Sequence, residues 1–284
     1  MSRMIGYLCN DDSLTPRVVQ EVAGDLSATD DAESDDVARG FGWIRDGQPL
    51  LRKHPPQGAN HTDMAAILAD IQAREIVGYE CTPERATVET QDLQPFSYRS
   101  WVYAQDGAGE VLQSRRDEIL DSLPDHIRRH LDGNAPSELG FHLFLAAMQR
   151  REGFGLARRE ARDCAAALAE TGSRIEQLRA SAGEVETPQS IDAVTVSDRL
   201  LMAWSGRGDL YVRKFDGIES PDEEPLFAGH DPESEEHPHF RAFLVVSAEA
   251  APGEDWRPVG QGEVLWVGDD WEVHSATAEA FDDV

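Results

Sequence analysis

Short apolar runs separated by polar turns occupy both ends of the chain, and a helical pattern of apolar residues occupies its middle. Runs bounded by Gly, Pro or Asp predict β-strands. These runs lie at residues 4–7, 41–44, 50–51, 75–79, 100–104, 193–205, 210–212, 240–246, 262–267 and 271–273. Asp46-Gly47 between two runs predicts a β-hairpin, and Gly268-Asp269-Asp270 predicts another.

Apolar residues three and four positions apart predict helices. The predicted helices cover residues 15–23, 61–73, 115–123, 137–148 and 156–182. Ser137 is a suitable N-cap for the fourth helix, and Gly172 is expected to break the fifth. Polar, acidic segments at 25–38, 82–95 and 217–239 are expected to be loops. The order of strands, helices and strands predicts one α+β layered domain.

The charge balance restricts the classes of partner. The 284 residues include 54 acidic and 26 basic ones, a formal net charge of −28. Such a chain lacks the basic face that nucleic acids or an anionic membrane surface require. No apolar run reaches the roughly 20 residues of a membrane span, and no signal peptide is evident. The cysteines, Cys9, Cys81 and Cys164, suit reduced thiols in a cytoplasmic protein. The only lysines are Lys53 and Lys214.

Two short motifs are poor candidates for metal or phosphate sites. Gly229-His230-Asp231 and Glu236-His237-Pro238-His239 do not have the spacing of a known metal motif, so a solvated loop is the better interpretation. Gly40-Phe41-Gly42 lacks the third glycine and the following helix of a phosphate loop. We therefore expect no metal and no cofactor.

The first residues offer a candidate nucleophile. If Met1 is removed, Ser2 carries both a hydroxyl and a free α-amine, and the amine can take the proton as the hydroxyl attacks. The segment after it, Met4-Ile5-Gly6-Tyr7, predicts a strand that would hold Ser2 in place. On this stretch alone, an ordinary N-terminal strand is the simpler interpretation.

A series of motifs along nearly the whole chain, residues 2–284, resembles the class II (type 2) glutamine amidotransferases, in particular their small stand-alone branch. Those enzymes are N-terminal-nucleophile hydrolases. The motifs are Met1-Ser2-Arg3-Met4-Ile5-Gly6-Tyr7, Gly40-Phe41-Gly42-Trp43-Ile44, Asp92-Leu93-Gln94-Pro95-Phe96, Gln105-Asp106-Gly107, Pro136-Ser137-Glu138, Ser247-Ala248-Glu249 and Gly262-Glu263-Val264. The resemblance implies a single domain with an αββα sandwich, in which two stacked antiparallel sheets lie between helical layers.

The same resemblance implies catalytic roles for Ser2, Asp106 and Gly107. Ser2 stands where the family has its Cys nucleophile, and a hydroxyl is a weaker nucleophile than a partly ionised thiol. Gln105-Asp106-Gly107 stands where the family has His-Asn-Gly, whose Asn side chain and Gly amide stabilise the oxyanion. An ionised Asp106 offers no donor and repels the developing negative charge.

Substrate-binding positions are also altered. The family binds the α-carboxylate of glutamine with an Arg, and the two alignments of this segment place Cys81 or Glu84 there, with Arg85 one step from Glu84. It binds the α-amine with the Asp of Asp-Ser-Glu, where Pro136 stands in this chain. Arg85, Cys81, Gln105 and Ser137 are therefore the candidate substrate-binding residues.

Three hypotheses for the function remain. The first is an amidotransferase-like protein that has lost glutaminase activity and serves as a binding or regulatory subunit. The second is an active serine amidohydrolase that cleaves another amide, and the third is an interaction protein that keeps only the fold. A small amide or amino-acid-like ligand and a separate synthase or other protein suit these hypotheses as partners.

Overall fold

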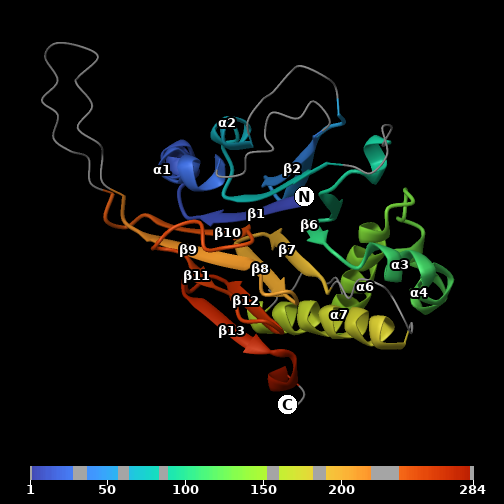
Figure 1. Cartoon of the computed structure of the whole chain (residues 1–284). Coiled ribbons are helices and arrows are strands. Elements are labelled where there is room, and N and C mark those ends of the chain that lie inside the picture. Colours follow the sequence, from blue (N-terminus) through green and yellow to red (C-terminus); the bar gives the residue numbers. More distant parts are fainter. Residues whose placement is uncertain are drawn as a thin grey trace, which may run out of the picture.

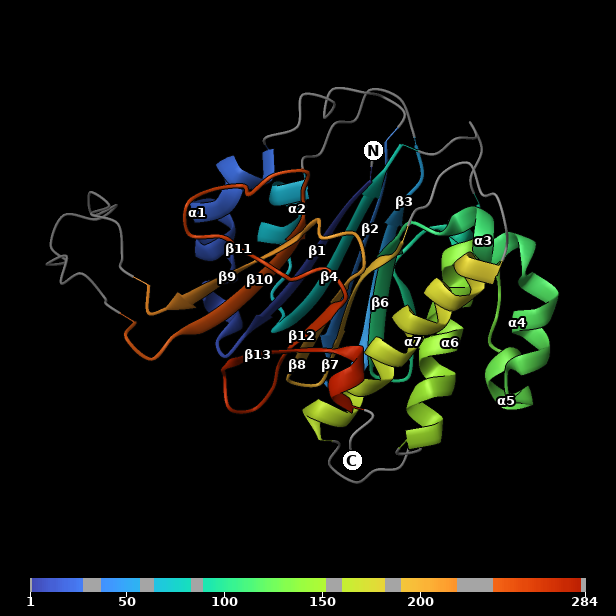
Figure 2. The same cartoon turned by 60° about the horizontal axis from the view of Figure 1, so that its bottom comes forward.

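Two antiparallel sheets stacked face to face form the centre of the molecule, and helices cover both outer faces (Figures 1 and 2). The computed structural model describes residues 2–27, 37–56, 64–82, 89–151, 160–181, 190–218 and 237–281. The layers confirm the α+β, αββα sandwich expected from the sequence. No helix within these ranges is long and apolar enough to cross a bilayer.

The first sheet has seven strands in the order β11-β9-β10-β1-β4-β2-β3. Their bounds are β1 (Ser2–Cys9), β2 (Ala38–Arg45), β3 (Gln48–His54), β4 (Glu75–Cys81), β9 (Leu210–Asp216), β10 (Arg241–Ser247) and β11 (Arg257–Pro258). Helices α1 (Thr15–Ser27) and α2 (Met64–Ala69) pack their apolar residues on its outer face. The 3₁₀ turn η1 (Asp12–Leu14) leads into α1.

The second sheet has six strands in the order β13-β12-β8-β7-β6-β5. Their bounds are β5 (Phe96–Tyr98), β6 (Trp101–Asp106), β7 (Asp192–Ser197), β8 (Leu200–Ser205), β12 (Glu263–Val267) and β13 (Val273–Thr277). Its outer face carries the helices α3 (Gly109–Ser114), α4 (Arg116–Ser122), α5 (Asp125–Arg128), α6 (Pro136–Arg151) and α7 (Ala161–Ser181). Two 3₁₀ turns, η3 (Thr90–Asp92) and η4 (Ala278–Phe281), complete the described elements.

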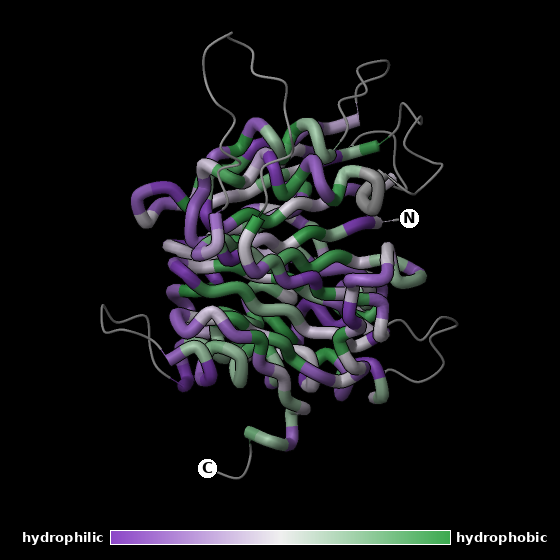
Figure 3. The backbone as a smooth tube through the Cα atoms, turned by 90° about the vertical axis from the view of Figure 1, so that its left-hand side faces the viewer, coloured by the Kyte–Doolittle hydropathy of each residue, from purple (hydrophilic) through white to green (hydrophobic). Residues whose placement is uncertain are grey.

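The inner faces of the sheets meet in a dry apolar layer, which appears as hydrophobic strands inside the molecule in Figure 3. β1 comes especially close to the second sheet at Gly6. A Cβ atom at this position would lie 2.3 Å from Val194 Cγ1 and 2.8 Å from Leu201 Cδ1. Only a residue without a side chain lets the central strand of one sheet rest directly on the other.

Of two predictions made from glycine positions, one is confirmed and one is wrong. The hairpin at Asp46-Gly47 is confirmed: β2 and β3 pair across it, and both turn residues have positive φ. The prediction that Gly172 breaks a helix is wrong, because α7 continues through it. Gly172 instead makes room for Trp204, whose indole Cε2 would lie 2.2 Å from an added Cβ.

Two further predictions are corrected. Residues 193–205 form two strands, β7 and β8, because Arg199 reverses the chain with φ near +55°. β8 and β9 belong to different sheets, so residues 206–208 link the two sheets. The third predicted helix, residues 115–123, is confirmed as α4, with the short helices α3 before it and α5 after it. The fourth begins at Pro136, which places Ser137 inside its first turn and not at the N-cap.

The burial of Glu75 can be tested through the pH dependence of the free energy of unfolding. Burial raises its pKa from the usual 4.5 to about 7, although its carboxylate accepts a hydrogen bond from the Arg199 amide. Between these pH values the folded chain holds a proton that the unfolded chain has released, so raising the pH lowers the free energy of unfolding. We expect Glu75→Gln to remove about 3 kcal/mol of this pH dependence. Urea unfolding of the wild type and of Glu75→Gln from pH 4.5 to 8 measures the free energy of unfolding at each pH. The same pH dependence in both proteins would contradict the raised pKa of Glu75.

Candidate functional site

Ser2 and Asp106 meet where the two sheets end. Ser2 begins β1 in the first sheet, and Asp106 ends β6 in the second. The Ser2 hydroxyl donates a hydrogen bond to Asp106 Oδ1. In Figure 1 the N-terminus accordingly lies beside β6. The structure thus brings together Ser2 and Asp106, two residues for which the resemblance implied catalytic roles.

Arg207 lies at the centre of this site. Its guanidinium Nη1 is 2.7 Å from Asp106 Oδ2, and its Nε is 3.2 Å from Asp192 Oδ2 and 3.3 Å from Asp209 Oδ2. Its backbone amide also donates to Asp192 Oδ1 at 3.0 Å. Burial opposes the charge of Arg207, but the carboxylates of Asp106 and Asp192 outweigh it and raise the pKa of the guanidinium.

The register of β6 and β7 explains why a cation is needed. Asp106 pairs directly with Asp192, so two carboxylates stand opposite each other on neighbouring strands, an unfavourable arrangement. Asp192 is completely buried, and this burial raises its pKa even though Arg207 favours its charged form. Arg207 bridges the two carboxylates and offsets their repulsion.

Cys81 lies directly opposite Ser2, on β4. Burial raises the pKa of its thiol to about 11, so the thiol is neutral at pH 7. Tyr79 adjoins Ser2 and Cys81, and burial raises the pKa of its phenol as well. The wall of the site next to Ser2 therefore offers neutral hydroxyl and thiol groups.

Gly107 follows Asp106 with φ +96°, a conformation that favours glycine. A Cβ atom at this position would lie 2.1 Å from the carbonyl oxygen of Ser190. The chain can therefore leave β6 in this direction only with a glycine at this position.

Gln105 is 1% exposed and is engaged within the protein. Its backbone amide and carbonyl bond to the side chain of Gln94 at 2.7 Å, and its Oε1 accepts a hydrogen bond from the Tyr103 hydroxyl at 2.8 Å. Ser137 is half-buried in the first turn of α6. Arg85 and Glu84 lie outside the described residues, as do His230 and Asp231. Among the described residues, no cluster of three His, Cys, Asp or Glu side chains could hold a metal ion.

Sequence reasoning missed Arg207 and its partners Asp192 and Asp209. The segment Gly206-Arg207-Gly208-Asp209 has the composition of a turn and predicts only a reversal of the chain. The one local signal was an Asp, Asp192, at the start of a strand. Its role can be recognised only when the strand that pairs with it is known.

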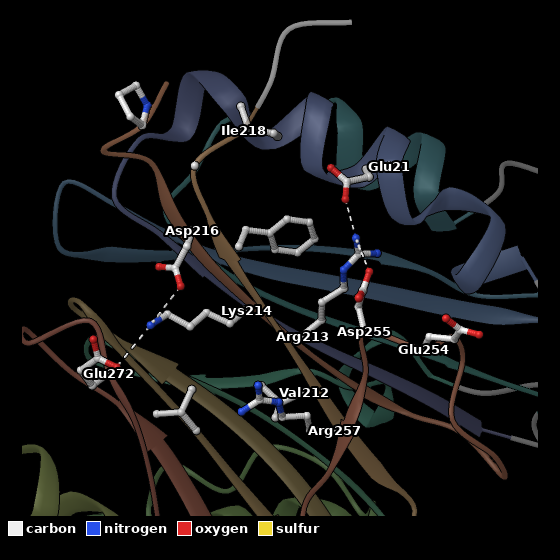
Figure 4. Close-up of a pocket in the computed structure, with 14 residues that line it drawn as sticks. Glu21, Val212, Arg213, Lys214, Asp216, Ile218, Glu254, Asp255, Arg257 and Glu272 are labelled. Atoms are coloured by element: carbon white, nitrogen blue, oxygen red, sulfur yellow. Dashed lines mark hydrogen bonds and ion pairs between the residues drawn. The ribbon is translucent and has the colours of Figure 1, made fainter. Parts of the chain in front are cut away.

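A large cavity lies at the other end of the first sheet (Figure 4). It has a volume of about 1090 Å³ and includes residues 212–218 of β9 and its extension. The C-terminal end of β9 is aligned, through β10, with Cys9, the last residue of β1. Ser2 is the first residue of β1 and lies at the opposite end of that strand. Two of the cavity's cations form ion pairs: Arg213 with Glu21 and Asp255, and Lys214 with Asp216 and Glu272. This cavity is therefore separate from the Ser2 site.

Solved structures with a similar fold are glutamine amidotransferase proteins. The similarity to a glutamine aminotransferase class-II domain protein from Silicibacter pomeroyi has a TM-score of 0.58 at 16% identity, over 97% of this chain and 98% of that one. For the glutamine phosphoribosylpyrophosphate amidotransferase of B. subtilis, the TM-score is 0.54 at 11% identity, over 97% of this chain and 49% of that one.

A predicted glutamine amidotransferase from Pseudomonas aeruginosa gives a TM-score of 0.52 at 12% identity, over 96% of this chain and 94% of that one. No protein-family model matches the sequence, and no curated protein matches it significantly. At these identities the similarity shows the fold, which is that of the class II, N-terminal-nucleophile amidotransferase domains.

Removing Arg207 tests its bridging role. Arg207→Gln leaves Asp106 and Asp192 opposed without a cation, and we expect the free energy of unfolding to fall by about 2–4 kcal/mol. Arg150→Gln is the control, because Arg150 pairs with Glu170 on the surface and should contribute less than about 1 kcal/mol. Urea denaturation at pH 7 compares the two variants. Equal losses of the free energy of unfolding in the two variants would show that Arg207 contributes no more than an ordinary surface ion pair does.

Proposed function

We propose that the chain is a class II glutamine amidotransferase-like protein in which hydrolysis of free glutamine is lost, and which serves as a binding or regulatory subunit. The observation that carries the proposal is the contact of Ser2 with Asp106, whose carboxylate is paired with Arg207. The carboxylate of Asp106 thus lies beside the hydroxyl of Ser2 and is held there by the guanidinium of Arg207.

A charged Asp106 is unsuited to the oxyanion position. The tetrahedral intermediate of amide hydrolysis carries a negative oxygen, and an ionised carboxylate has no proton to donate to it. Loss of one such donor typically lowers the rate by about 10²–10³, and a repelling charge should cost more. The Ser2 hydroxyl is also directed to a group other than the substrate.

The neutral groups on the β4 side of Ser2 support the inference that glutamine binds weakly. The Cys81 thiol opposite Ser2 cannot pair with an α-carboxylate as a guanidinium does. Pro136 begins α6 without a side-chain carboxylate for an α-amine. A lost hydrogen bond to a charged group typically costs about 1.5–3 kcal/mol, so the two changes together weaken recognition of free glutamine strongly.

The Ser2–Asp106 hydrogen bond also supports a second candidate function, a serine amidohydrolase for another amide. In this mechanism Asp106 accepts the proton of the Ser2 hydroxyl as the oxygen attacks the carbonyl carbon. Transfer of a proton to Asp106 would disrupt its ion pair with Arg207, and this is why we place the candidate second.

Ammonia release distinguishes the two candidates. We expect no release from glutamine or from a panel of γ-glutamyl amides beyond that of Ser2→Ala, because the intermediate lacks stabilisation. Mass spectrometry of the purified chain records whether Met1 has been removed. Release that disappears in Ser2→Ala would reject loss of activity and favour the amidohydrolase.

A restored site provides the complementary measurement. The double variant Ser2→Cys with Asp106→Asn supplies a thiol and an oxyanion donor. If the electrostatics of Asp106 are the main defect, we expect kcat/KM for glutamine to rise at least about 10²-fold above the wild-type value. Asp106→Asn alone is the control for the oxyanion donor. No increase would place the main defect in recognition of glutamine.

A further inference from the structure

Strand β3 forms an open edge of the first sheet. Within the described residues it pairs only with β2. With seven residues it is the longest of the four edge strands, since β11 has two, β5 has three and β13 has five. An open edge of this length can accept a strand from another chain. The strands β2 and β4 separate it from β1, so this edge is not part of the Ser2 site.

The hairpin determines which backbone groups of β3 face outward. Its two-residue turn, Asp46-Gly47, makes the residues on either side of it a hydrogen-bonded pair. Bonded and non-bonded pairs alternate along an antiparallel ladder. Residues 48, 50, 52 and 54 therefore bond to β2, and residues 49, 51 and 53 direct their backbone groups away from it. Pro49 has no N–H, which leaves the amides of Leu51 and Lys53 as outward donors. No backbone acceptor among the described residues bonds to these two amides.

Two exposed leucines lie on this edge. Leu50 is 41% exposed and Leu51 is 38% exposed, and in the described part of the chain only one other large hydrophobic side chain is exposed. Neighbouring residues of a strand point to opposite faces of the sheet. Leu50 therefore shares one face with Arg52, and Leu51 shares the other with Lys53. An added strand would shield both leucines from water, which favours its binding.

The charge of this edge is opposite to that of the whole chain. Residues 45–54 include three cations, Arg45, Arg52 and Lys53, and one carboxylate, in a chain of net charge −28. Within the described residues no carboxylate forms an ion pair with Arg45 or Arg52. Lys53 interacts with carboxylates only at longer range. The two guanidinium groups are therefore available to carboxylates of another molecule.

The opposite side of the same sheet differs in this respect. There Arg213 and Lys214 of β9 are paired with carboxylates of the chain itself. Complementary charges across an interface select the partner. Two copies of β3 side by side would bring cations together, so the edge disfavours pairing with itself and favours an acidic strand.

We propose that the β3 edge binds an extended acidic segment of a partner protein, which adds to the first sheet as an antiparallel strand. The segment would run past Lys53, Arg52, Leu51 and Leu50 in that order. Cross-strand pairs of opposite charge and of apolar side chains are favourable. The segment therefore carries two acidic residues followed by two aliphatic ones. This inference goes beyond the proposed function and does not depend on whether the Ser2 site is active.

Fluorescence anisotropy of the full chain tests the proposal with the labelled peptide Ser-Asp-Glu-Val-Ile-Thr. We expect a Kd on the order of 100 µM. The same peptide with Lys-Lys in place of Asp-Glu, and the peptide of reversed sequence, should bind at least about tenfold more weakly.

Charge reversal at the edge gives the matched comparison. Arg52→Glu should weaken binding of the acidic peptide about tenfold or more. Arg257→Glu is the control, because Arg257 is exposed on β11 at the opposite edge of the same sheet and the change in net charge is identical. It should alter the Kd by less than about twofold, since charges farther apart than about 10 Å are screened by salt.

Amide hydrogen exchange of the wild-type chain separates strand addition from simple charge attraction. The saturating peptide should slow exchange at Leu51 and Lys53 at least about fivefold, because both amides gain an acceptor. The proposal is overturned if the peptide does not bind, if the lysine-containing or reversed peptide binds equally well, if the two arginine variants behave alike, or if neither amide is protected. A dimer of the chain that the peptide does not dissociate would also overturn it, because the occupant of the edge would then be a second copy.

Discussion

The close contact between the two sheets determines where every group of the Ser2 site lies. At Gly6 the central strand β1 rests on Val194 and Leu201 without an intervening side chain. This contact sets the distance between the sheets a few residues away from Ser2. The hydroxyl of Ser2 in one sheet thereby reaches the carboxylate of Asp106 in the other. A larger residue at position 6 would separate the sheets and with them the two halves of the site.

Charge compensation is the second requirement of this arrangement. An amide side chain at position 106 could stand opposite Asp192 without repulsion, but a carboxylate requires a cation in the same place. Arg207 meets the requirement from the turn that links the sheets. Asp106 and Arg207 therefore form one unit, and the chemistry of Ser2 cannot be judged from residue 106 alone.

The sequence predicts features that depend on neighbouring residues and misses those that depend on strand pairing. Asp46-Gly47 adopts positive φ by its own local chemistry, so the β2–β3 hairpin could be recognised. Asp106 could be located only through motif resemblance. Arg207 could not be found, since its partners come from the register of β6 with β7. Gly172 was misjudged because helix propensity says nothing of Trp204, which it accommodates.

The ion pairs around the cavity beside β9 also have a consequence for solubility. β11 pairs with β9 only at Val212 and Tyr211, so within the described residues the outer edge of Arg213–Asp216 has no neighbouring strand. Such an edge is a template on which a second chain could add a strand and begin aggregation. Arg213 and Lys214 place charged side chains and their carboxylate partners along this edge (Figure 4). An approaching chain would have to desolvate these pairs, which discourages intermolecular sheet growth.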